Sequence, residues 1–235
     1  MLRFKRFITL NEGVHDQGIF HAVFMAGGPG SGKDYVMSRT LHGHGLREIN
    51  SDVAFEHAMK KHKLDPKMPE HETEKRDVVR GAAKETTEKK KQLSIDGRNG
   101  LIINGTGNDP EKYHKIKSHL ESMGYKTHML FVHTHNDVSR ARNIARGNAG
   151  GRTVPEKVRQ DSWNDVQAAK EHYKKMFGDS YHEVDNSIDM QKSSPEKIAT
   201  HNEALDNKFK HFRKVTASKE RTPEAEKWVQ SKLKK

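Results

Sequence analysis

The sequence predicts an α/β fold, a three-layer sandwich in which helices cover both faces of a five-stranded parallel sheet of order 2-3-1-4-5, followed by a basic helical extension. Three observations predict it. Short apolar segments alternate with segments of helical length, which is typical of crossover connections between parallel strands. The first apolar segment runs into a glycine-rich loop that opens a helix. A chain of 235 residues is long enough for one principal core and too short for two full domains with linkers.

The first expected strand, residues 19–26, is a continuous apolar run rich in β-branched and aromatic side chains, as found in buried strands. Four further segments are expected to form the other strands: 46–50, 101–105, 125–134 and, at the edge of the sheet, 180–186.

The expected helices fill the intervals between these strands. One begins within residues 31–41, and another follows residue 50, where Ser51 or Asp52 can act as the N-cap. Asp109 and Pro110 begin a helix in the favoured way, with a capping residue before a proline at the first helical position. Further helices are expected over residues 136–146, 155–177, 195–215 and 223–235.

Residues 70–93 are helical in character but mostly charged. We expect this helix to lie over the sheet with one thin apolar stripe, formed by Val78, Val79, Ala82, Ala83 and Leu93.

The absence of cysteine excludes disulfides and thiolate metal sites and favours a reducing compartment. No apolar run approaches the roughly 20 residues of a membrane helix, and the N-terminal segment lacks the long apolar stretch of a signal peptide. We therefore expect a cytoplasmic protein that makes no membrane contact.

The formal net charge of +11 and the pI of about 9.6 favour polyanionic partners such as nucleic acid. The excess is uneven: from Lys208 to Lys235 the chain has ten Lys and Arg against three Glu, a net +7. Two interpretations remain open for this segment, a solvated basic tail and a surface that binds a polyanion.

Residues 27–34, GGPGSGKD, match the phosphate-binding pattern G-x-x-x-x-G-K between an expected strand and an expected helix. Glycines allow main-chain N–H groups to approach a phosphate, and the following helix adds its positive end. Lys33 then reaches the β- and γ-phosphates. The pattern predicts that ATP is bound by Gly27, Gly28, Pro29, Gly30, Ser31, Gly32, Lys33 and Asp34.

Asp34 departs from the usual pattern, which has Ser or Thr as a Mg²⁺ ligand after the lysine. A carboxylate is also a good ligand for a hard cation. Asn104 ends the third expected strand, where many P-loop proteins have a metal-associated Asp. Our hypothesis is that the metal-binding acid lies at Asp34 instead of at the end of the third strand, so that Asp34 binds Mg²⁺ and Asn104 stays neutral. The alternative is a degenerate loop that binds nucleotide weakly.

Asp52 follows the second expected strand, at the carboxyl edge of the sheet where Lys33 also lies. It can accept the proton of an acceptor hydroxyl or orient that hydroxyl toward the γ-phosphate. A plain N-cap remains the alternative explanation.

Four arginines, Arg140, Arg142, Arg146 and Arg152, surround a glycine-rich segment near residues 146–155. Guanidinium groups that close over a nucleotide stabilise the spreading charge and exclude water. We assign this lid role to Arg142, Arg146 and Arg152, and a solvated helix face to Arg140.

Two histidine pairs, His42 with His44 and His133 with His135, lack a third ligand at a familiar zinc spacing. The second pair ends the fourth expected strand and shares one face, so a substrate contact is an open interpretation.

These motifs resemble the zeta-toxin-like P-loop kinases encoded by tailed phages, over about residues 19–186. The resemblance rests on the segments GGPGSGKD, NSD at 50–52, NGTG at 104–107, Arg142-Asn143 and RTVPEKVRQDSWNDVQ from residue 152. It implies that Asp52 is the catalytic base, that Thr106 lines the acceptor site, and that Arg142, Arg146 and Arg152 clamp the phosphates. The order of the elements, with a linker-like segment after residue 186, divides the chain into a polar segment 1–18, a P-loop kinase domain 19–186 and a basic helical tail 187–235.

Zeta toxins phosphorylate nucleotide sugars, whereas related phage kinases phosphorylate 5-hydroxymethyluracil bases within DNA. The basic tail favours the second acceptor. We therefore expect transfer of the γ-phosphoryl group of ATP, with Mg²⁺, to a hydroxyl on DNA, in the host cytoplasm if the chain is phage-encoded. The alternatives are a small-molecule kinase for a nucleotide sugar or nucleoside, and a non-catalytic nucleotide-dependent DNA-binding protein.

Overall fold

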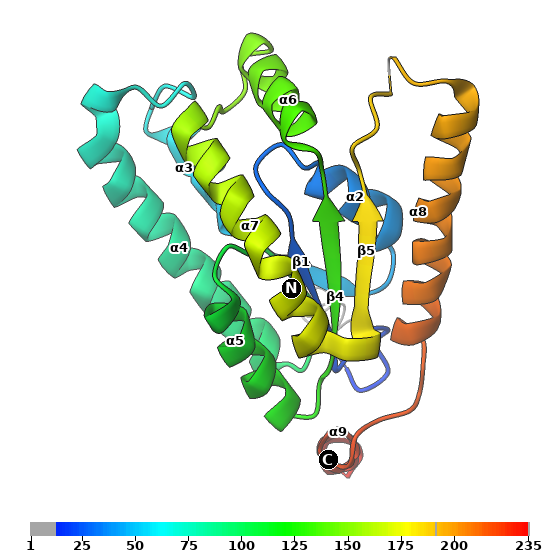
Figure 1. The fold of residues 1–235 in the computed structure, drawn as a ribbon. Coiled ribbons are helices and arrows are strands. Elements are labelled where there is room, and N and C mark those ends of the chain that lie inside the picture. The colour runs from blue at the N-terminus through cyan, green and yellow to red at the C-terminus, as the bar shows by residue number, and fades with distance from the viewer. Residues whose placement is uncertain (1–12, 191, 235) are drawn as a thin grey trace, which may run out of the picture.

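The computed structural model describes residues 13–190 and 192–234 and contains a five-stranded, all-parallel sheet of order β2-β3-β1-β4-β5. The strands are β1 His21–Ala26, β2 Leu46–Ile49, β3 Gly100–Asn104, β4 Lys126–His133 and β5 Tyr181–Asp185. Their carboxyl ends all lie at one edge of the sheet, the upper edge in Figure 1. The predicted α/β class and strand order are confirmed. Residues 1–12 of the polar N-terminal segment lie outside the described residues.

The helices connect these strands as expected. They are α2 Lys33–Thr40, α3 Ser51–Lys61, α4 Thr73–Asp96, α5 Pro110–Ser122, α6 Asn136–Asn148, α7 Glu156–Phe177, α8 Pro195–Thr216 and α9 Pro223–Leu233, with short 3₁₀ turns η1 Glu70–Glu72 and η2 Gly178–Ser180. No helix in the described ranges is both long and apolar enough to cross a lipid bilayer.

The N-caps follow from side chains that accept a main-chain hydrogen bond. Asp109 caps α5 as predicted, because its carboxylate accepts from the N–H of Lys112. The prediction for α3 was wrong: the cap is Asn50, whose Oδ1 accepts from the N–H of Asp52 at 2.9 Å. Asn50 has the extended backbone conformation of an N-cap, while Ser51 and Asp52 already lie in the first helical turn.

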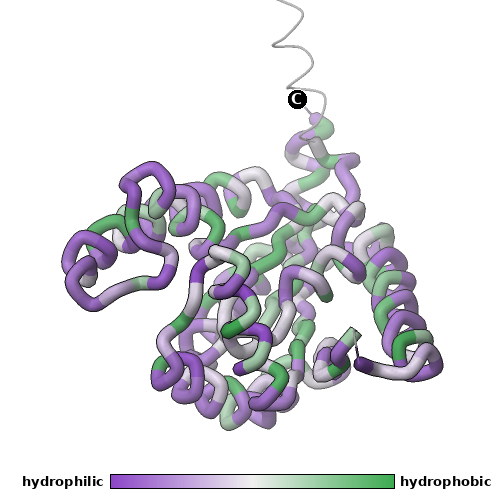
Figure 2. The backbone as a smooth tube through the Cα atoms, turned by 90° about the horizontal axis from the view of Figure 1, so that it is seen from above, coloured by the Kyte–Doolittle hydropathy of each residue, from purple (hydrophilic) through white to green (hydrophobic). Residues whose placement is uncertain are grey.

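Two apolar cores lie on opposite faces of the sheet and produce the three layers. One contains Phe24 and Phe131 from the sheet and Tyr173 from α7. The other contains Val23 from β1 and Leu205 from α8. Figure 2 shows hydrophobic segments through the interior and hydrophilic segments over much of the outer helices.

Helix α4 differs from its prediction. Val79 and Ala83 are buried, but they pack against Phe55 of α3 in a third, separate cluster. Val78 and Leu93 are exposed, at 75% and 72% of their surface. Figure 1 shows α4 extending along one side of the molecule. The predicted stripe over the sheet was therefore wrong, because Val79 and Ala83 pack against α3, and it is Ile95 in the last turn of α4 that joins a core on the sheet.

The basic helices α8 and α9 contribute to both main cores. Leu205 and Phe212 of α8 belong to one core, and Ala225 and Val229 of α9 belong to the other. The domain boundary at residue 186 stays a prediction, but the helices beyond it are packed against the sheet domain.

Candidate active site

The loop between β1 and α2, residues 27–32, packs closely against neighbouring main chain and side chains. Gly30 and Gly32 have positive φ angles of 74° and 78°. A Cβ atom at Gly30 would lie 2.4 Å from the carbonyl oxygen of Ser139, and one at Gly32 would lie 2.4 Å from Nδ2 of Asn186. Side chains are therefore excluded at both positions, as the glycine-rich motif requires.

The carbonyl groups of this loop accept hydrogen bonds from the residues that directly follow β4 and β5 and from α6. Ser31 O accepts from Oγ1 of Thr134 at 3.1 Å and from Nδ2 of Asn186 at 2.7 Å. Pro29 O accepts from Oγ of Ser139 at 2.6 Å. These hydrogen bonds fix the loop in place. The first main-chain N–H groups of α2 have no partner within the helix, so they are the groups suited to an anion.

Lys33 is the first residue of α2, and its ammonium group lies at the loop. Nζ donates to the carbonyl of Gly27 at 2.6 Å and contacts that of Gly28 at 3.5 Å. The hydroxyl of Ser31 is buried and has no hydrogen-bond partner among the described residues. An ammonium group, an unpaired buried hydroxyl and a helix N-terminus together fit the phosphates of a nucleotide.

Several of the predicted site residues act on Lys33 electrostatically. Burial lowers the pKa of Lys33 to about 8, while the negative charges of Asp52 and Asp34 oppose this shift and the positive charges of Arg146 and Arg152 add to it. The structure therefore places all four charged groups around the phosphate-loop lysine.

Asp52 lies in the first turn of α3, with its side chain 49% exposed. Because Asn50 is the cap, the carboxylate of Asp52 is not used to begin the helix. It pairs instead with Arg152, whose Nη2 lies 3.4 Å from its Oδ1. Arg152 also donates to Glu56 at 3.1 Å and lies over the ring of Phe55. The N-cap explanation of Asp52 is thus removed, and its role as a base stays a prediction.

Asp34 and Asn104 lie close together, as the metal hypothesis requires. Nδ2 of Asn104 is 3.5 Å from Oδ1 of Asp34 and donates to Oε1 of Glu48 at 2.8 Å. Asn50 donates to the same oxygen of Glu48 at 2.9 Å. The two carboxylates are oxygen ligands that suit Mg²⁺, so Asp34 and Glu48 fit this ion, while Asn104 presents its N–H group to both. The role of Asp34 as a ligand remains a prediction.

Thr106 lies beside the start of the phosphate loop. Its carbonyl accepts a hydrogen bond from the N–H of Gly27 at 2.9 Å. The next carbonyl, that of Gly107, accepts from the buried hydroxyl of Tyr173. This turn is therefore fixed next to the nucleotide site, and its contact with an acceptor remains a prediction.

The lid arginines occupy different positions. Arg142 points at the outside of the phosphate loop, with Nη1 3.4 Å from Ser31 O, and donates through Nη2 to Ile188 O at 2.7 Å. Burial lowers the pKa of Arg142. Arg146 and Arg140 are exposed on α6. Arg142 thus supports the main chain of the loop, whereas the exposed side chain of Arg146 is free to turn toward a bound phosphate.

The predicted lid segment is shorter than expected, because α6 continues to Asn148 and includes Arg146. Asn143 fixes the remaining segment by donating to Val154 O at 2.8 Å and accepting from Val154 N at 3.0 Å. The N–H of Thr153 also donates to the carbonyl of Pro66 in the α3–α4 connection. The lid segment therefore joins α6 to the part of the chain that carries Asp52.

Comparison with known proteins shows the family. The profile of the Zeta toxin family matches residues 9–194. The chain belongs to the Zeta toxin family. Membership of this family fits a nucleotide-dependent phosphotransferase, that is, a kinase-like enzyme. No curated protein matches the chain.

Solved structures support the same fold. The chain resembles a structure from the PezAT toxin–antitoxin system of Streptococcus pneumoniae, with a TM-score of 0.51, 17% identity and coverage of 100% of this chain and 94% of that one. It also resembles a candidate kinase from Chloroflexus aurantiacus, with a TM-score of 0.50, 13% identity and coverage of 77% and 95%. At these identities the likeness concerns the fold.

Sequence reasoning missed several residues at this edge of the sheet: Glu48, Thr134, Ser139, Arg159 and Asn186. Glu48, Thr134 and Asn186 lie at or just after strand ends, a position that signals a site in a parallel sheet. Arg159 is fully buried, pairs with Glu156 at 2.9 Å and donates to Ser139. Its only signal in the sequence was the Glu–Arg spacing of three residues at the start of a helix.

Proposed function

We propose that this protein is an ATP-dependent kinase that transfers the γ-phosphoryl group to a hydroxyl group. The observation that carries the proposal is the phosphate loop, where the ammonium group of Lys33 lies at the start of α2, together with the half-exposed carboxylate of Asp52 at the same edge of the sheet. A base for the acceptor and a cation for the phosphates thus share one edge of the sheet. Membership of the Zeta toxin family supports the same class of reaction.

In the proposed reaction, the start of α2 binds the phosphates of ATP and Lys33 contacts the β- and γ-phosphates. Asp52 accepts the proton of the acceptor hydroxyl as the hydroxyl oxygen attacks the γ-phosphorus. The bond from the γ-phosphorus to the bridging oxygen breaks, and Lys33 stabilises the charge left on ADP. When bound, Mg²⁺ supplies further charge neutralisation on the phosphates, and Asp34 and Glu48 are the residues that would bind it.

For the acceptor we propose a hydroxyl on nucleic acid, with 5-hydroxymethyluracil in phage DNA as the first substrate to test. The net charge of +11 supports a polyanionic acceptor, because each phosphate contacted by a Lys or Arg adds to affinity through counterion release. Lys210, Arg213 and Lys214 are exposed on α8 and would contribute to such contacts.

A specific observation favours a small acceptor, such as a nucleotide sugar, as the second candidate. The carbonyl of Thr216, at the end of α8, accepts from the N–H of Gly18 just before β1. The basic end of α8 therefore lies at the amino edge of the sheet, opposite the phosphate loop (Figure 1). A nucleic acid that contacts the basic end of α8 and also reaches the phosphate loop must extend along the length of the molecule.

The test is phosphoryl transfer from labelled ATP to four acceptors in parallel: ordinary DNA, hydroxymethyluracil DNA, 5′-hydroxyl oligonucleotides and UDP-sugars. The Lys33→Ala variant is the control for contaminating kinases, and its activity should be lost. Label in hydroxymethyluracil DNA alone supports the proposed acceptor, and label in a UDP-sugar alone selects the second candidate. A parent protein that labels none of the four and does not bind ATP contradicts the proposed function.

Deleting the segment after residue 186 is a poor test of the basic helices, because Leu205 and Val229 belong to the cores. Charge reversal at Lys210, Arg213 and Lys214 keeps the packing. With a nucleic-acid acceptor it should lower activity at least several-fold and reduce the dependence on salt.

The matched control reverses three exposed lysines on other helices: Lys84, Lys89 and Lys115. If both triple variants lose activity equally, α8 is not a specific contact surface.

A further inference from the structure

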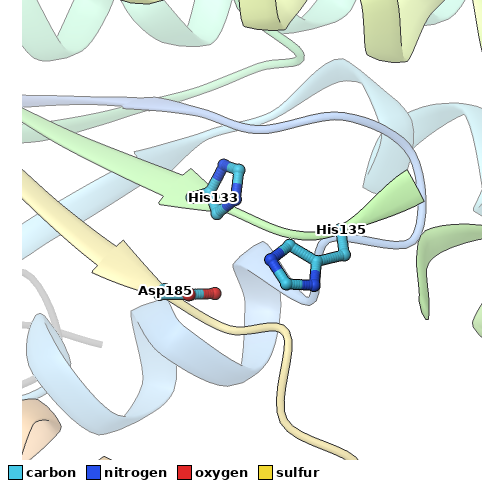
Figure 3. Close-up of side chains that lie close together, drawn as sticks. All are labelled: His133, His135 and Asp185. Atoms are coloured by element: carbon cyan, nitrogen blue, oxygen red, sulfur yellow. The ribbon is translucent and has the colours of Figure 1, made fainter. Parts of the chain in front are cut away.

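Three potential metal ligands meet at the carboxyl ends of β4 and β5 (Figure 3). His133 and Asp185 are paired in the register of the two strands, and His135 follows β4 by two residues. One ligand atom from each of the three side chains lies within 4.8 Å of the other two. The third ligand that the histidine pair lacked in the sequence is thus supplied by a neighbouring strand.

Outer hydrogen bonds orient two of these side chains. Nδ1 of His133 lies 3.2 Å from Oε1 of Gln167 on α7, so that with a proton on Nδ1 the Nε2 nitrogen is left as the ligand atom. Oδ1 of Asp185 accepts from the hydroxyl of Ser187 at 2.6 Å and from its N–H at 2.9 Å. Metal-ligating histidines and carboxylates in proteins usually have such outer partners.

We propose that His133, His135 and Asp185 form a binding site for a divalent transition-metal ion of the Zn²⁺ class. Two imidazoles and one carboxylate suit Zn²⁺ or Cu²⁺ better than Mg²⁺, which prefers oxygen ligands alone. Tetrahedral bonds of about 2.1 Å place ligand atoms about 3.4 Å apart. The ligand atoms of the three side chains lie within 4.8 Å of one another, and rotation of the exposed His135 side chain can bring them to the shorter spacing. Water completes the coordination.

The site is distinct from the proposed Mg²⁺ position, which lies with Asp34 and Glu48 on the β2–β3 side of the phosphate loop. It is nonetheless connected to that loop. Thr134 and Asn186 alternate with the three ligands along the same two segments, and both donate to the carbonyl of Ser31. A metal ion would fix the two strand ends from which the loop is supported.

The first experiment titrates the full chain with Zn²⁺ alone, against a chromophoric chelator, at neutral pH. We expect one site of at least micromolar affinity in the parent and a loss of at least tenfold in His135→Ala. The matched control is His114→Ala, an exposed histidine on α5, which should bind like the parent. Equal affinity of His135→Ala and the parent would overturn the proposal.

The second experiment identifies the ligands with Cu²⁺ as the probe. Electron paramagnetic resonance of one bound equivalent should show two imidazole nitrogens in the parent and one in His135→Ala. Circular dichroism and thermal unfolding without metal establish that the variant is folded. A spectrum that is the same in parent and variant assigns the ion to other histidines and rejects the site.

Discussion

The guanidinium group of Arg152 contacts the carboxylate of Asp52, with Nη2 3.4 Å from Oδ1. The arginine side chain is only 11% exposed, whereas that of Asp52 is 49% exposed. An acceptor hydroxyl can therefore reach Asp52 from solvent but must compete with Arg152 for its oxygens. In the proposed reaction, the guanidinium moves toward the phosphates as the hydroxyl takes its place.

The first prediction concerns the base. Asp52→Asn should lower kcat by about 10²- to 10⁴-fold, because an amide cannot accept the proton of the acceptor hydroxyl. Binding of ADP should change much less than kcat, since in the proposed reaction Asp52 does not contact the phosphates and affects them only through Lys33 and Arg152. Steady-state kinetics and ADP titration measure the two effects.

Glu56→Gln is the matched control for Asp52→Asn, because Glu56 also pairs with Arg152. It should keep kcat within a few-fold of the parent. An unchanged kcat in Asp52→Asn would remove Asp52 as the base, and an equal loss in both variants would assign the effect to the position of Arg152.

The second prediction concerns pH. Burial lowers the pKa of Lys33 to about 8, so the side chain is a cation below that pH and neutral above it. ADP affinity should fall as the pH rises through about 8, by up to about tenfold per unit at the steepest point. Bound phosphates favour the cation and move the midpoint upward. Titrations of ADP between about pH 7 and pH 9.5 measure the effect.

The control for this pH effect is Lys33→Arg, since a guanidinium stays charged throughout that range. Its affinity, whatever its absolute value, should not fall. A parent affinity that is constant over the range, or a fall of equal size in both proteins, would show that Lys33 does not titrate there.

The fold could be predicted because its signals are local. Each strand is a short apolar run, and the phosphate loop is a contiguous motif between a strand and a helix, so residues 19–34 alone establish the central unit. The placement of α4 could not be predicted in this way. Val78 and Val79 are equally apolar, and only the contact of Val79 with α3 decides which of them is buried.

The candidate site also contains both residues that the sequence predicts and residues that it does not. Lys33, Asp34 and Asp52 lie in or near recognisable motifs, and the sequence placed them at the same edge. Asp185 ends the last strand and Asn186 follows it, and both are far along the chain from the residues beside which they lie. No spacing rule links such residues, because their proximity depends on which strands are neighbours.

The third prediction concerns the metal dependence of the reaction. If Asp34 binds Mg²⁺, Asp34→Ala should raise the Mg²⁺ concentration needed for half-maximal activity by at least about tenfold. Asp34→Ser restores the residue usual at this position and should be affected less. Activity as a function of Mg²⁺ at saturating ATP measures both. An Asp34→Ala variant with the parent Mg²⁺ dependence would contradict the hypothesis.

The fourth prediction concerns three histidines on neighbouring strands, on the face of the sheet that packs against α8. His128 of β4 stacks between His21 of β1 and His182 of β5, with ring centroids 6.2 Å and 6.3 Å apart, and Phe212 packs edge-on against it. Both ring nitrogens of His128 are buried without a hydrogen-bond partner among the described residues. Burial lowers the pKa of each of the three histidines to about 4, and nearby positive groups add to the shift.

These shifts should make the protein less stable in mild acid. The folded-state pKa values lie below the ordinary value of 6.5, so the unfolded chain binds more protons between pH 6.5 and pH 4. The stabilisation is complete above pH 6.5 and is lost as the pH falls toward 4. His21, which is only 4% exposed, contributes a loss of about 2–3 kcal/mol over that range.

Urea unfolding followed by circular dichroism at several pH values between about 7 and 5 measures this dependence. His128→Phe keeps a ring against Phe212 but removes the two unpaired nitrogens, so its free energy of unfolding should fall less steeply as the pH is lowered. His114→Asn, an exposed control, should follow the parent. If His128→Phe and the parent have the same slope, protonation of the buried histidines is not what destabilises the fold in acid, and the carboxylates must account for it.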